Sequence, residues 1–328
     1  MLKYALMRQL ILSALKQGNS VSGEELGKKL NISRAAIWKH INKLRKKGYK
    51  ITSSPQSGYR LIESAARFIP EEVDLGLNNK LIGKRILYRE DVTSTQDVAE
   101  GLAKLGGEDG IVVISEKQST GRGRKGRDWD SPTGEGIYLS VILRPNLTPG
   151  QVLQIPLIAG VAVGKAIKMV SSLEPRIKWP NDIMIGDRKV GGILTEMNSE
   201  INKVNYVILG IGINVTTPRA LFPESIRSIA TSLAEECGET ISRGRLLRHI
   251  LAEFESLYTQ FLTSGFEGIR EEWKAMNNTT GSRVKISGEE GEIEGEALDI
   301  DSEGFLLIRK ENGNVKRIIS GDVSLRAP

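Results

Sequence analysis

The residues best suited to chemistry in this chain lie in one short basic loop. Between Gln118 and Pro132 the sequence reads Q-S-T-G-R-G-R-K-G-R-D-W-D-S-P. Three glycines alternate there with four cations, namely Gly121, Gly123 and Gly126 with Arg122, Arg124, Lys125 and Arg127. Glycine lets backbone N–H groups approach a bound anion, and guanidinium groups match phosphate or carboxylate oxygens. The loop therefore predicts an anion-binding site, and repulsion among its charges predicts that it is mobile until an anion neutralises it.

The loop alone does not identify a function, because a glycine- and arginine-rich segment can also be a solvated loop or a nucleic-acid tether. A tether is a low-complexity sequence, whereas this motif occurs once and is followed by Trp129. The sequence therefore favours a folded clamp that an anionic ligand orders.

Other reactive side chains are scarce, with only His40, His249 and Cys237 among the histidines and cysteines. This composition excludes a Cys/His zinc site and an intramolecular disulfide, and it disfavours Ser-His-Asp or Cys-His catalysis. We expect the chemistry to rely on lysine, arginine, carboxylates, backbone amides and Mg²⁺ with a bound nucleotide. No apolar run reaches membrane-spanning length and no signal peptide is recognisable, so we expect a cytoplasmic protein without a membrane partner.

Four further segments carry residues that suit a ligand pocket. They are Asp91–Gln96, Arg176–Asp182, Arg188–Glu196 and Val207–Val215. The first offers hydroxyl groups at a helix N-terminus, and the second arranges Lys178, Asn181 and Asp182 around a Trp-Pro corner. The third places Lys189 at the end of a buried strand, and the fourth is an apolar strand with two glycines where a ligand can lie against the backbone. Each also has an ordinary explanation, such as a solvated lysine or a β-bulge, so the prediction depends on their combination.

The net charge of +6 is unevenly distributed. Residues 1–66 carry 13 Lys/Arg against 3 Asp/Glu, a net charge of +10, and the remainder carries 33 against 37, a net charge of −4. A basic excess confined to one segment is typical of contact with a phosphate backbone, although a basic surface without such a partner has the same charge.

Hydrophobic spacing in the basic segment predicts a winged helix-turn-helix. Helices are expected over Leu2–Gln17, over Gly23–Leu30, and from an N-cap at Ser33 to Gly48. The first should bury Leu6, Leu10 and Ala14, and the third should bury Ile37, Ile41 and Leu44. A β-hairpin wing is expected on either side of Ser54–Gly58.

The opposite face of the third helix carries the candidate DNA contacts. They are Ser33, Arg34, Ala35, Trp38, Lys39, Asn42 and Lys46. The charge and the small Ala35 at the start of the helix favour DNA binding over a winged helix that contacts only proteins.

After a linker at Glu63–Phe68, alternating β-like and helical runs predict an α/β domain. Strands are expected over Arg85–Arg89, Ile111–Glu116, Gly136–Leu143, Arg188–Glu196 and Asn205–Val215, and helices over Thr95–Leu105, Gln151–Val170 and Arg243–Leu262. From Gly281 onward, short strands separated by glycine turns predict a small all-β barrel of the SH3-like size.

Taken together, these motifs resemble those of biotin–protein ligases. The resemblance covers S-T-Q at 94–96, G-R-G-R-x-G-R-x-W at 121–129, K-W-P-N-D at 178–182, R-K-x-x-G-I-L at 188–194 and G-x-G-I-N at 210–214. The winged helix in front and the small barrel behind are similar to the bifunctional form that also represses biotin genes. The resemblance implies a multidomain α+β chain: a winged helix-turn-helix over 1–63, a central α/β ligase domain with a mixed sheet of the class II synthetase-like, biotin–lipoyl ligase fold over 69–277, and an SH3-like β-barrel over 280–328.

The resemblance also implies roles for individual residues. Biotin would contact Ser94, Thr95, Gln96, Gln118, Arg122, Gly123, Arg124, Trp129, Lys189, Gly210 and Gly212. ATP and the adenylate would contact Arg124, Lys178, Asn181, Asp182, Asn214 and Arg326. Lys189, Arg124 and Arg122 would be catalytic, and Asn181 and Asp182 would bind Mg²⁺. Bulky Trp38 on the third helix puts the transfer of the family's operator contacts in doubt.

The implied reaction has two steps, which need no histidine base. Biotin and ATP would give biotinyl-AMP and pyrophosphate, and a lysine of a biotin carboxyl carrier protein would then take the biotinyl group. The adenylate-bound protein would form a homodimer on palindromic operator DNA. Two alternatives stay open: a biotin-responsive regulator without ligase activity, and a monofunctional ligase with a vestigial winged helix.

Overall fold

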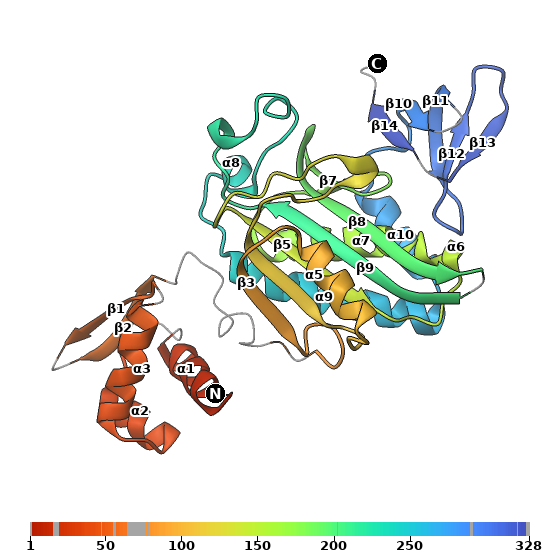
Figure 1. Cartoon of the computed structure of the whole chain (residues 1–328). Helices are drawn as coiled ribbons and strands as arrows, with labels where there is room; N and C mark the ends of the chain where they lie inside the picture. The colour runs from red at the N-terminus through yellow and green to blue at the C-terminus, as the bar shows by residue number, and fades with distance from the viewer. Residues whose placement is uncertain are drawn as a thin grey trace. The chain divides into compact units, whose positions relative to one another are not determined.

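The computed structural model describes residues 2–15, 20–46, 48–54, 57–63, 77, 79–201, 203–288, 291–319 and 321–325 (Figure 1). The chain forms two compact units, Met1–Leu77 and Asn78–Pro328. The linker predicted at Glu63–Phe68 lies outside the described residues apart from Glu63, and the three predicted domain boundaries stay predictions.

The first unit is a three-helix fold followed by a β-hairpin. Its elements are α1 (Leu2–Leu15), α2 (Gly23–Leu30), α3 (Arg34–Lys46), β1 (Lys50–Ser54) and β2 (Gly58–Glu63). The predicted N-cap is confirmed, because the Ala36 N–H donates to the Ser33 hydroxyl at 3.2 Å. The turn between α2 and α3 packs closely against Gly27 of α2. A glycine is needed at this position, because a Cβ there would lie 2.7 Å from the Ile32 carbonyl oxygen. β1 and β2 pair antiparallel, as predicted for the wing.

The buried face of α1 differs from the expected one. Leu10 is 42% exposed, whereas Ile11 and Leu15 are buried in the core of the unit. Ala14 is buried as expected, so the prediction is wrong at Leu10 and misses Ile11 and Leu15. Periodicity was a poor guide because the apolar residues of this helix occur on more than one side of it. The Leu6 side chain and the expected helix end at Gln17 lie outside the described residues.

The face of α3 predicted to be buried is confirmed: Ile37, Ile41 and Leu44 are buried, together with His40. The candidate DNA contacts lie on the outer side, where Ser33, Arg34, Ala35, Trp38, Lys39 and Lys46 are exposed and Asn42 is half-buried. Arg45 fixes the wing to this helix, because its guanidinium donates to the Ile51 carbonyl at 2.9 Å and to the Ser53 hydroxyl at 3.0 Å.

The second unit is built on a seven-stranded mixed sheet. Its strands are β3 (Ile86–Val92), β4 (Val112–Gln118), β5 (Gly136–Leu143), β6 (Arg176–Lys178), β7 (Asp182–Ile185), β8 (Arg188–Glu200) and β9 (Lys203–Asn214). They lie in the order β3-β4-β5-β9-β8-β7-β6, in which β3 and β4 pair parallel and the other neighbours pair antiparallel. The mixed sheet predicted for the central domain is thus confirmed.

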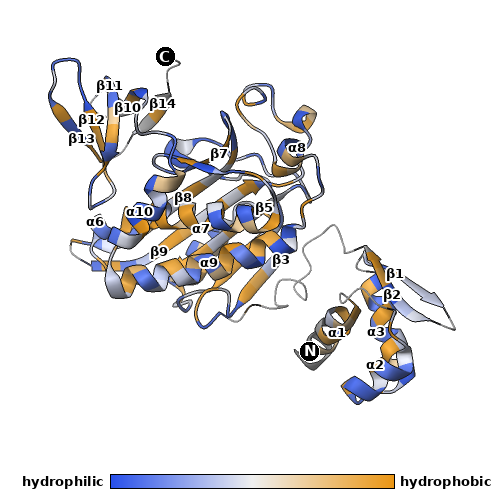
Figure 2. Cartoon of the chain, turned by 180° about the vertical axis from the view of Figure 1, so that it is seen from behind, coloured by the Kyte–Doolittle hydropathy of each residue, from blue (hydrophilic) through white to orange (hydrophobic). Residues whose placement is uncertain are grey.

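Helices cover both faces of this sheet. They are α5 (Thr95–Lys104), α6 (Pro149–Val152), α7 (Ile155–Val170), α8 (Leu233–Cys237), α9 (Arg243–Ser264) and α10 (Glu267–Met276). Figures 1 and 2 show α5 on one face and α7, α9 and α10 on the other. Ala99 and Ala103 of α5 pack on Val113, Ile142 and Ile208 of the sheet, and this packing places the start of α5 beside the centre of β9.

Two expectations for this unit need correction. The helix expected over Gln151–Val170 is interrupted after α6, and α7 begins with Pro156 in its first turn, where a proline is well accommodated. Strands β6 and β7 were not expected, because each is only three or four residues long and carries too little alternation to recognise.

The segment Pro149–Val170 is long and apolar enough to cross a membrane, contrary to the expectation that no such run exists. In the structure 72% of its most apolar 18-residue window is buried, and α7 packs between the sheet and α9 (Figure 2). Its apolarity therefore supplies the hydrophobic core.

The C-terminal part forms a five-stranded antiparallel sheet. Its strands are β10 (Arg283–Gly288), β11 (Gly291–Ile300), β12 (Leu306–Arg309), β13 (Val315–Ile318) and β14 (Asp322–Leu325), in the order β13-β12-β11-β10-β14. The all-β character expected from Gly281 onward is confirmed, and closure of this sheet into an SH3-like barrel stays a prediction.

Candidate functional site

A pocket of about 340 Å³ lies between the start of α5, the basic loop and the strands β8 and β9. The predicted biotin and nucleotide residues that the structure describes all line it: Ser94, Thr95, Gln96, Gln118, Arg122, Gly123, Arg124, Trp129, Lys178, Asn181, Asp182, Lys189, Gly210, Gly212 and Asn214. Arg326 lies outside the described residues. The basic loop and the four further segments, spread over more than a hundred residues of sequence, thus meet at one place.

One end of the pocket is a buried hydrogen-bond network at the N-terminus of α5. Ser94 is the N-cap of the helix, and Thr95 donates from its backbone to Gln118 Oε1 at 2.8 Å. The Thr95 hydroxyl also lies 2.8 Å from the Ser140 hydroxyl, which donates to Gln96 Oε1 at 2.8 Å. Ser140 was missed by the sequence analysis, although a serine inside the apolar strand G-I-Y-L-S-V-I-L was a usable signal.

Glycines on β8 and β9 make room for side chains above them. A Cβ on Gly210 would lie 2.8 Å from Gln96 Oε1, and one on Gly212 would lie 2.6 Å from the Trp129 indole. A Cβ on Gly192, which belongs to the R-K-x-x-G-I-L motif but had no assigned role, would lie 2.9 Å from the same indole. The glycines thus form a floor, as expected, and the groups lying directly against it are protein side chains.

The basic loop has a defined fold in this structure. It connects β4 to β5 and contains a single 3₁₀ turn, η1 (Arg124–Gly126). The Gly123 N–H donates to the Arg127 carbonyl at 2.7 Å, and the Trp129 N–H donates to the Gly121 carbonyl at 2.8 Å. These hydrogen bonds fold the loop into a strap that carries the indole of Trp129 to the glycine floor. The mobility expected without an anion stays a prediction.

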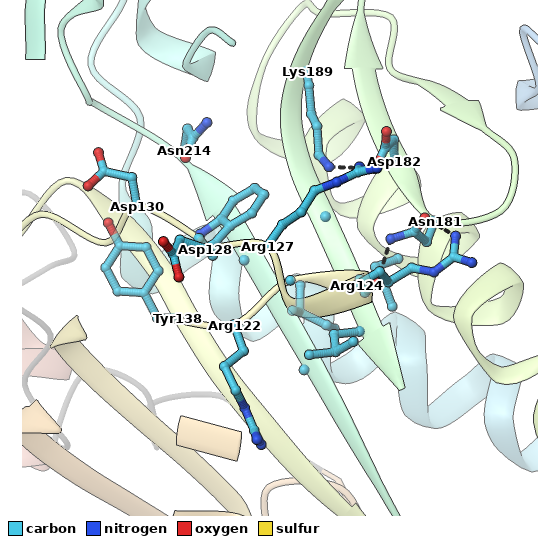
Figure 3. A pocket seen from close by; sticks show the side chains of 18 of the residues that line it. Arg122, Arg124, Arg127, Asp128, Asp130, Tyr138, Asn181, Asp182, Lys189 and Asn214 are labelled. Carbon is cyan, nitrogen blue, oxygen red and sulfur yellow. Dashed lines mark hydrogen bonds and ion pairs between the residues drawn. The ribbon is translucent and has the colours of Figure 1, made fainter. Parts of the chain in front are cut away.

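The arginines of this strap point in different directions (Figure 3). Arg122 Nη2 lies 3.1 Å from Asp97 Oδ1 and 2.9 Å from Glu196 Oε2. Arg124 instead donates to Asn181 Oδ1 at 3.0 Å. A joint contact of both arginines with one ligand carboxylate, as the resemblance implies, therefore requires Arg122 to leave its two acidic partners.

The other end of the pocket is cationic. Lys189 Nζ lies 2.5 Å from Asp182 Oδ1 and 5.4 Å from the centroid of the Trp129 ring, and Lys178 Nζ lies 3.9 Å from Asp182 Oδ2 (Figure 3). The backbone of Lys189 is fixed on its other side, because its N–H donates to the Ile229 carbonyl at 2.8 Å. Two ammonium groups thus share one carboxylate at a site open to an anionic ligand.

The residues predicted to bind Mg²⁺ fit a nucleotide-borne ion better than a resident one. The described residues contain no group of three or more His, Cys, Asp and Glu side chains that could hold a metal. Asn181 already uses both ends of its amide, accepting from Arg124 and donating to the Ile193 carbonyl at 2.7 Å. Asp182 is then the carboxylate of the predicted pair, and Mg²⁺ in phosphate sites is commonly held by one or two carboxylates together with the phosphates.

Several pocket residues were missed by the sequence analysis. Phe222, Ile226, Ile229 and Ala230 supply an apolar wall beside Lys189 and Asn214. Asn214 contacts this segment directly, donating to the Thr231 carbonyl at 3.0 Å. The wall comes from an irregular stretch whose apolar residues have neither helical nor strand periodicity, so the sequence offered no signal for it. An apolar wall beside a cationic site is an arrangement that could accommodate the base of a nucleotide.

Burial perturbs two ionisable groups of the pocket. Desolvation raises the pKa of the Asp130 carboxyl above its ordinary value, against a backbone hydrogen bond from Ser131 that lowers it. Desolvation also raises the pKa of the Tyr138 hydroxyl, so this group stays protonated and donates to the Pro132 carbonyl at 3.0 Å. The Tyr138 hydroxyl thereby fixes the end of the basic loop at Pro132.

The C-terminal sheet reaches the same pocket. Lys125 Nζ donates to the Ser287 carbonyl at 3.1 Å, Arg124 reaches the Gly321 carbonyl at 3.5 Å, and Val323 lines the pocket. Trp179 of the K-W-P-N-D motif is buried and donates from Nε1 to the Gly304 carbonyl at 3.0 Å, so this tryptophan joins the central sheet to the C-terminal one.

Three models of known protein families match separate parts of the chain. A family model described as the biotin/lipoate A/B protein ligase family matches residues 88–214. A model described as an HTH domain matches residues 8–60, and one described as the biotin protein ligase C terminal domain matches residues 279–326.

Individual proteins are similar over nearly the whole length. The chain is 39% identical to the bifunctional ligase/repressor BirA of Bacillus spizizenii over 97% of this chain and 98% of that protein. It is 31% identical to the bifunctional ligase/repressor BirA of Escherichia coli over 97% of this chain and 96% of that protein. A solved structure of a biotin protein ligase from Aquifex aeolicus in complex with biotin and ATP aligns with a TM-score of 0.65 at 32% identity, covering 75% of this chain and 100% of that chain.

Proposed function

Because this chain belongs to the family of bifunctional biotin ligase/repressors, we propose that it activates biotin with ATP, transfers it to a carrier protein, and represses transcription. In the first step biotin and ATP give biotinyl-AMP and pyrophosphate. In the second, a lysine amine of a biotin carboxyl carrier protein attacks the mixed anhydride and releases AMP. The observation that carries the ligase activity is a single pocket with a buried hydrogen-bonding end and a cationic end, joined by a glycine floor.

The buried end suits the ureido ring of biotin, whose N–H and C=O groups need fixed partners. Ser94, Thr95 and Gln118 offer such partners, and their own hydrogen bonds hold them in place. The valerate chain would then run along the glycine floor toward Lys189. The family resemblance supports this direction, as do the positions of Gly210 beside Gln96 and of Gly212 and Gly192 under Trp129.

The cationic end suits the reacting groups. Lys189 would stabilise the negative charge that develops as the biotin carboxylate attacks the α-phosphate of ATP. Arg124 would hold the acyl phosphate, and Lys178 with Asn181 would contact the remaining phosphates. Positioning and charge neutralisation are sufficient for such a displacement, which uses no histidine base. The apolar wall of Phe222, Ile226 and Ile229 would support the adenine, beside Asn214.

Magnesium would enter with the triphosphate and reduce its charge, with Asp182 as the protein carboxylate facing it. Before ATP binds, Asp182 pairs with Lys189 and Lys178, and the three groups together keep a net charge of +1. When Mg²⁺–ATP enters, both lysines would exchange Asp182 for the phosphates. Asp182 would thus be a temporary partner for the two lysines while the nucleotide is absent.

The winged helix supplies the repressor activity, with α3 placed in the major groove of operator DNA. We further propose that adenylate binding favours a homodimer, whose two winged helices match a palindromic operator, and that the protein acts in the cytoplasm. When carrier protein is scarce, the adenylate stays bound and transcription is repressed. The +10 charge of residues 1–66 and the exposed basic face of α3 support the DNA partner.

Pyrophosphate release tests the enzymatic part. The full-length protein is mixed with Mg²⁺–ATP and with biotin, lipoate or octanoate, and pyrophosphate is measured over one turnover. We expect release with biotin alone. Biotin binding without pyrophosphate would instead indicate a regulator without ligase activity, and release with lipoate or octanoate would reassign the substrate.

A gel shift at fixed salt tests the regulatory part, using a palindromic operator fragment from the biotin genes of the source organism. We expect biotin and ATP together to tighten binding, and analytical ultracentrifugation to show a dimer under the same conditions. Operator affinity that is indifferent to both ligands would remove the adenylate switch. No operator binding under any condition would leave a monofunctional ligase.

A further inference from the structure

A continuous series of hydrogen bonds links the buried end of the pocket to a carboxylate on β8. Glu196 Oε2 accepts from Gln96 Nε2 at 2.8 Å, and Gln96 Oε1 accepts from the Ser140 hydroxyl at 2.8 Å. The Ser140 hydroxyl in turn lies 2.8 Å from the Thr95 hydroxyl. Gln96, Ser140 and Thr95 are buried, whereas Glu196 is half-buried. These four side chains form what we call the polar relay.

The carboxylate sets the direction of every hydrogen bond in the polar relay. A carboxylate only accepts, so Gln96 must turn its donating Nε2 to Glu196 and its accepting Oε1 to Ser140. A serine hydroxyl has one proton, and Ser140 gives it to Gln96. The Ser140 oxygen can therefore only accept from Thr95, and the Thr95 proton points into the protein.

The second neighbour of the Thr95 hydroxyl acts in the same sense. Gln118 Oε1 lies 3.1 Å from this hydroxyl and also accepts from the Thr95 backbone N–H at 2.8 Å. The amide of Gln118 is held in this orientation, because its Nε2 donates to the Ser131 hydroxyl at 2.9 Å. Both of these neighbours of the Thr95 hydroxyl are thus acceptors. Thr95 lines the pocket, and what its hydroxyl offers there is a lone pair.

We propose that the polar relay keeps the Thr95 hydroxyl oxygen a hydrogen-bond acceptor toward the pocket, so that this end selects a ring that presents an N–H group. The inference rests on the proposed function and deepens it, because the ureido ring of biotin has two N–H groups. A buried acceptor that meets no donor is costly, so a ring without the N–H is rejected. Gln96 and Ser140 are then positioning residues, which act on the ligand through Thr95.

The probes are biotin and its two cyclic carbamate analogues, in each of which oxygen replaces one ureido N–H. Each analogue turns one donor of the ring into an acceptor and keeps the ring size and the valerate chain. Isothermal titration calorimetry of the full-length protein without ATP gives the Kd of each ligand, and the ratio of carbamate Kd to biotin Kd measures selectivity. Thr95→Val identifies the carbamate whose ring oxygen faces Thr95, because selectivity against it depends on this hydroxyl.

Two variants interrupt the polar relay at different points. Ser140→Ala removes the nearer acceptor of the Thr95 proton. Gln96→Met, which is similar in length, keeps both hydroxyls but removes the acceptor of the Ser140 proton. Ser115→Ala is the matched control, because Ser115 is also a buried strand serine, donates to the Lys117 carbonyl at 2.6 Å and does not line the pocket. Thermal unfolding midpoints check that each variant is folded.

We expect wild type to bind the carbamate that faces Thr95 about 5- to 100-fold more weakly than biotin, because two acceptors then oppose each other. In Ser140→Ala and in Gln96→Met the Thr95 proton can turn toward the carbamate oxygen. Each variant should therefore lower this selectivity about fivefold or more, and biotin affinity about 2- to 10-fold. The double variant should lower the selectivity no further, since both changes act through the same proton. Ser115→Ala should keep the wild-type selectivity.

The outcomes separate the polar relay from the proposed function. Wild-type selectivity in both relay variants, with selectivity lost in Thr95→Val, would overturn the relay and leave the ligase assignment intact. Additive effects of Ser140→Ala and Gln96→Met would also overturn it, because they would show two independent contributions. If Ser140→Ala does not fold, Gln96→Met decides alone. If wild type binds no biotin, the proposed function fails and the inference fails with it.

Discussion

The indole of Trp129 lies directly against the backbone of Gly212, where an added Cβ would come within 2.6 Å of the ring. Real Cβ atoms do not approach other atoms so closely, so any side chain at this position displaces the tryptophan. Trp129 belongs to the basic loop and Gly212 lies near the end of β9, so this contact sets how closely the strap approaches the sheet where it crosses the pocket. The first prediction follows from it.

Replacing Gly212 with alanine should weaken biotin binding by about 5- to 100-fold, because overpacking typically costs about 1–3 kcal/mol. Isothermal titration calorimetry with biotin measures the change. Gly150→Ala is the matched control, because a Cβ there would contact nothing within 4 Å. Equal biotin affinities for the two variants would show that the pocket does not need Trp129 in this position.

The sequence predicted the pocket well where a local motif carried the information. Lys189, Asp182 and the glycines of β9 come from motifs whose residue types are unusual for their surroundings, and the structure brings them together. The apolar wall at Phe222 was missed, because an irregular segment has no periodicity. The acidic partners of Arg122 were also missed, since ion pairs between elements far apart in sequence depend on tertiary packing and leave no local pattern.

The fold shows the same division. The expected ranges of β8, β9 and α9 differ from the observed ones by only a few residues at each end. Long periodic patterns made these elements recognisable. The short strands β6 and β7 form only because the edge of β8 offers hydrogen-bonding groups, which is a tertiary effect. In α1, Leu10 is exposed because the remaining helices cover the stripe around Ile11 instead.

Replacing Lys189 with methionine should lower the rate of adenylate formation by about 10²- to 10³-fold, because it removes a positive charge aimed at the reacting phosphate. Biotin affinity should change far less, since the lysine contacts the developing charge and not the ureido ring. Single-turnover pyrophosphate release and biotin titration separate these two quantities. Lys203→Met, at the start of β9, is the matched control and should retain wild-type rates. A similar loss in binding and rate would argue that Lys189 acts in the ground state only.

Replacing Arg124 with alanine should let the adenylate escape, because the strap loses its contacts with Asn181 and with the Gly321 carbonyl. The released mixed anhydride would then biotinylate lysines of unrelated proteins. Streptavidin blotting of a bystander protein such as serum albumin measures this reaction, with Arg219→Ala as an exposed arginine control. Bystander labelling no greater than that of wild type, with adenylate formation intact, would contradict the clamp.

Two residues on the exposed face of α3 should affect DNA binding differently. Lys39→Ala should weaken binding to all sequences and reduce the slope of log K against log salt by about 0.9, as expected for one phosphate contact. Trp38, which is 55% exposed, is uncharged, so Trp38→Ala should leave the slope unchanged and alter the preference among operator variants. Gel shifts over a salt series on specific and random fragments distinguish the two. A change in salt slope for Trp38→Ala would show that it acts by reshaping the phosphate contacts.

The winged helix should lose stability as the pH falls below about 6.5. Burial, with the nearby positive charges of Arg8 and Lys43, lowers the pKa of His40 in α3 from its ordinary value of 6.5. In the window between the lowered pKa and 6.5, the unfolded chain binds more protons than the folded one, so the free energy of unfolding decreases as the pH decreases. Amide hydrogen exchange of α3 in the full-length protein, corrected for intrinsic rates, measures this at pH 7.5 and 5.5. His40→Gln should flatten the dependence, and an equally steep one in that variant would assign the effect to other groups.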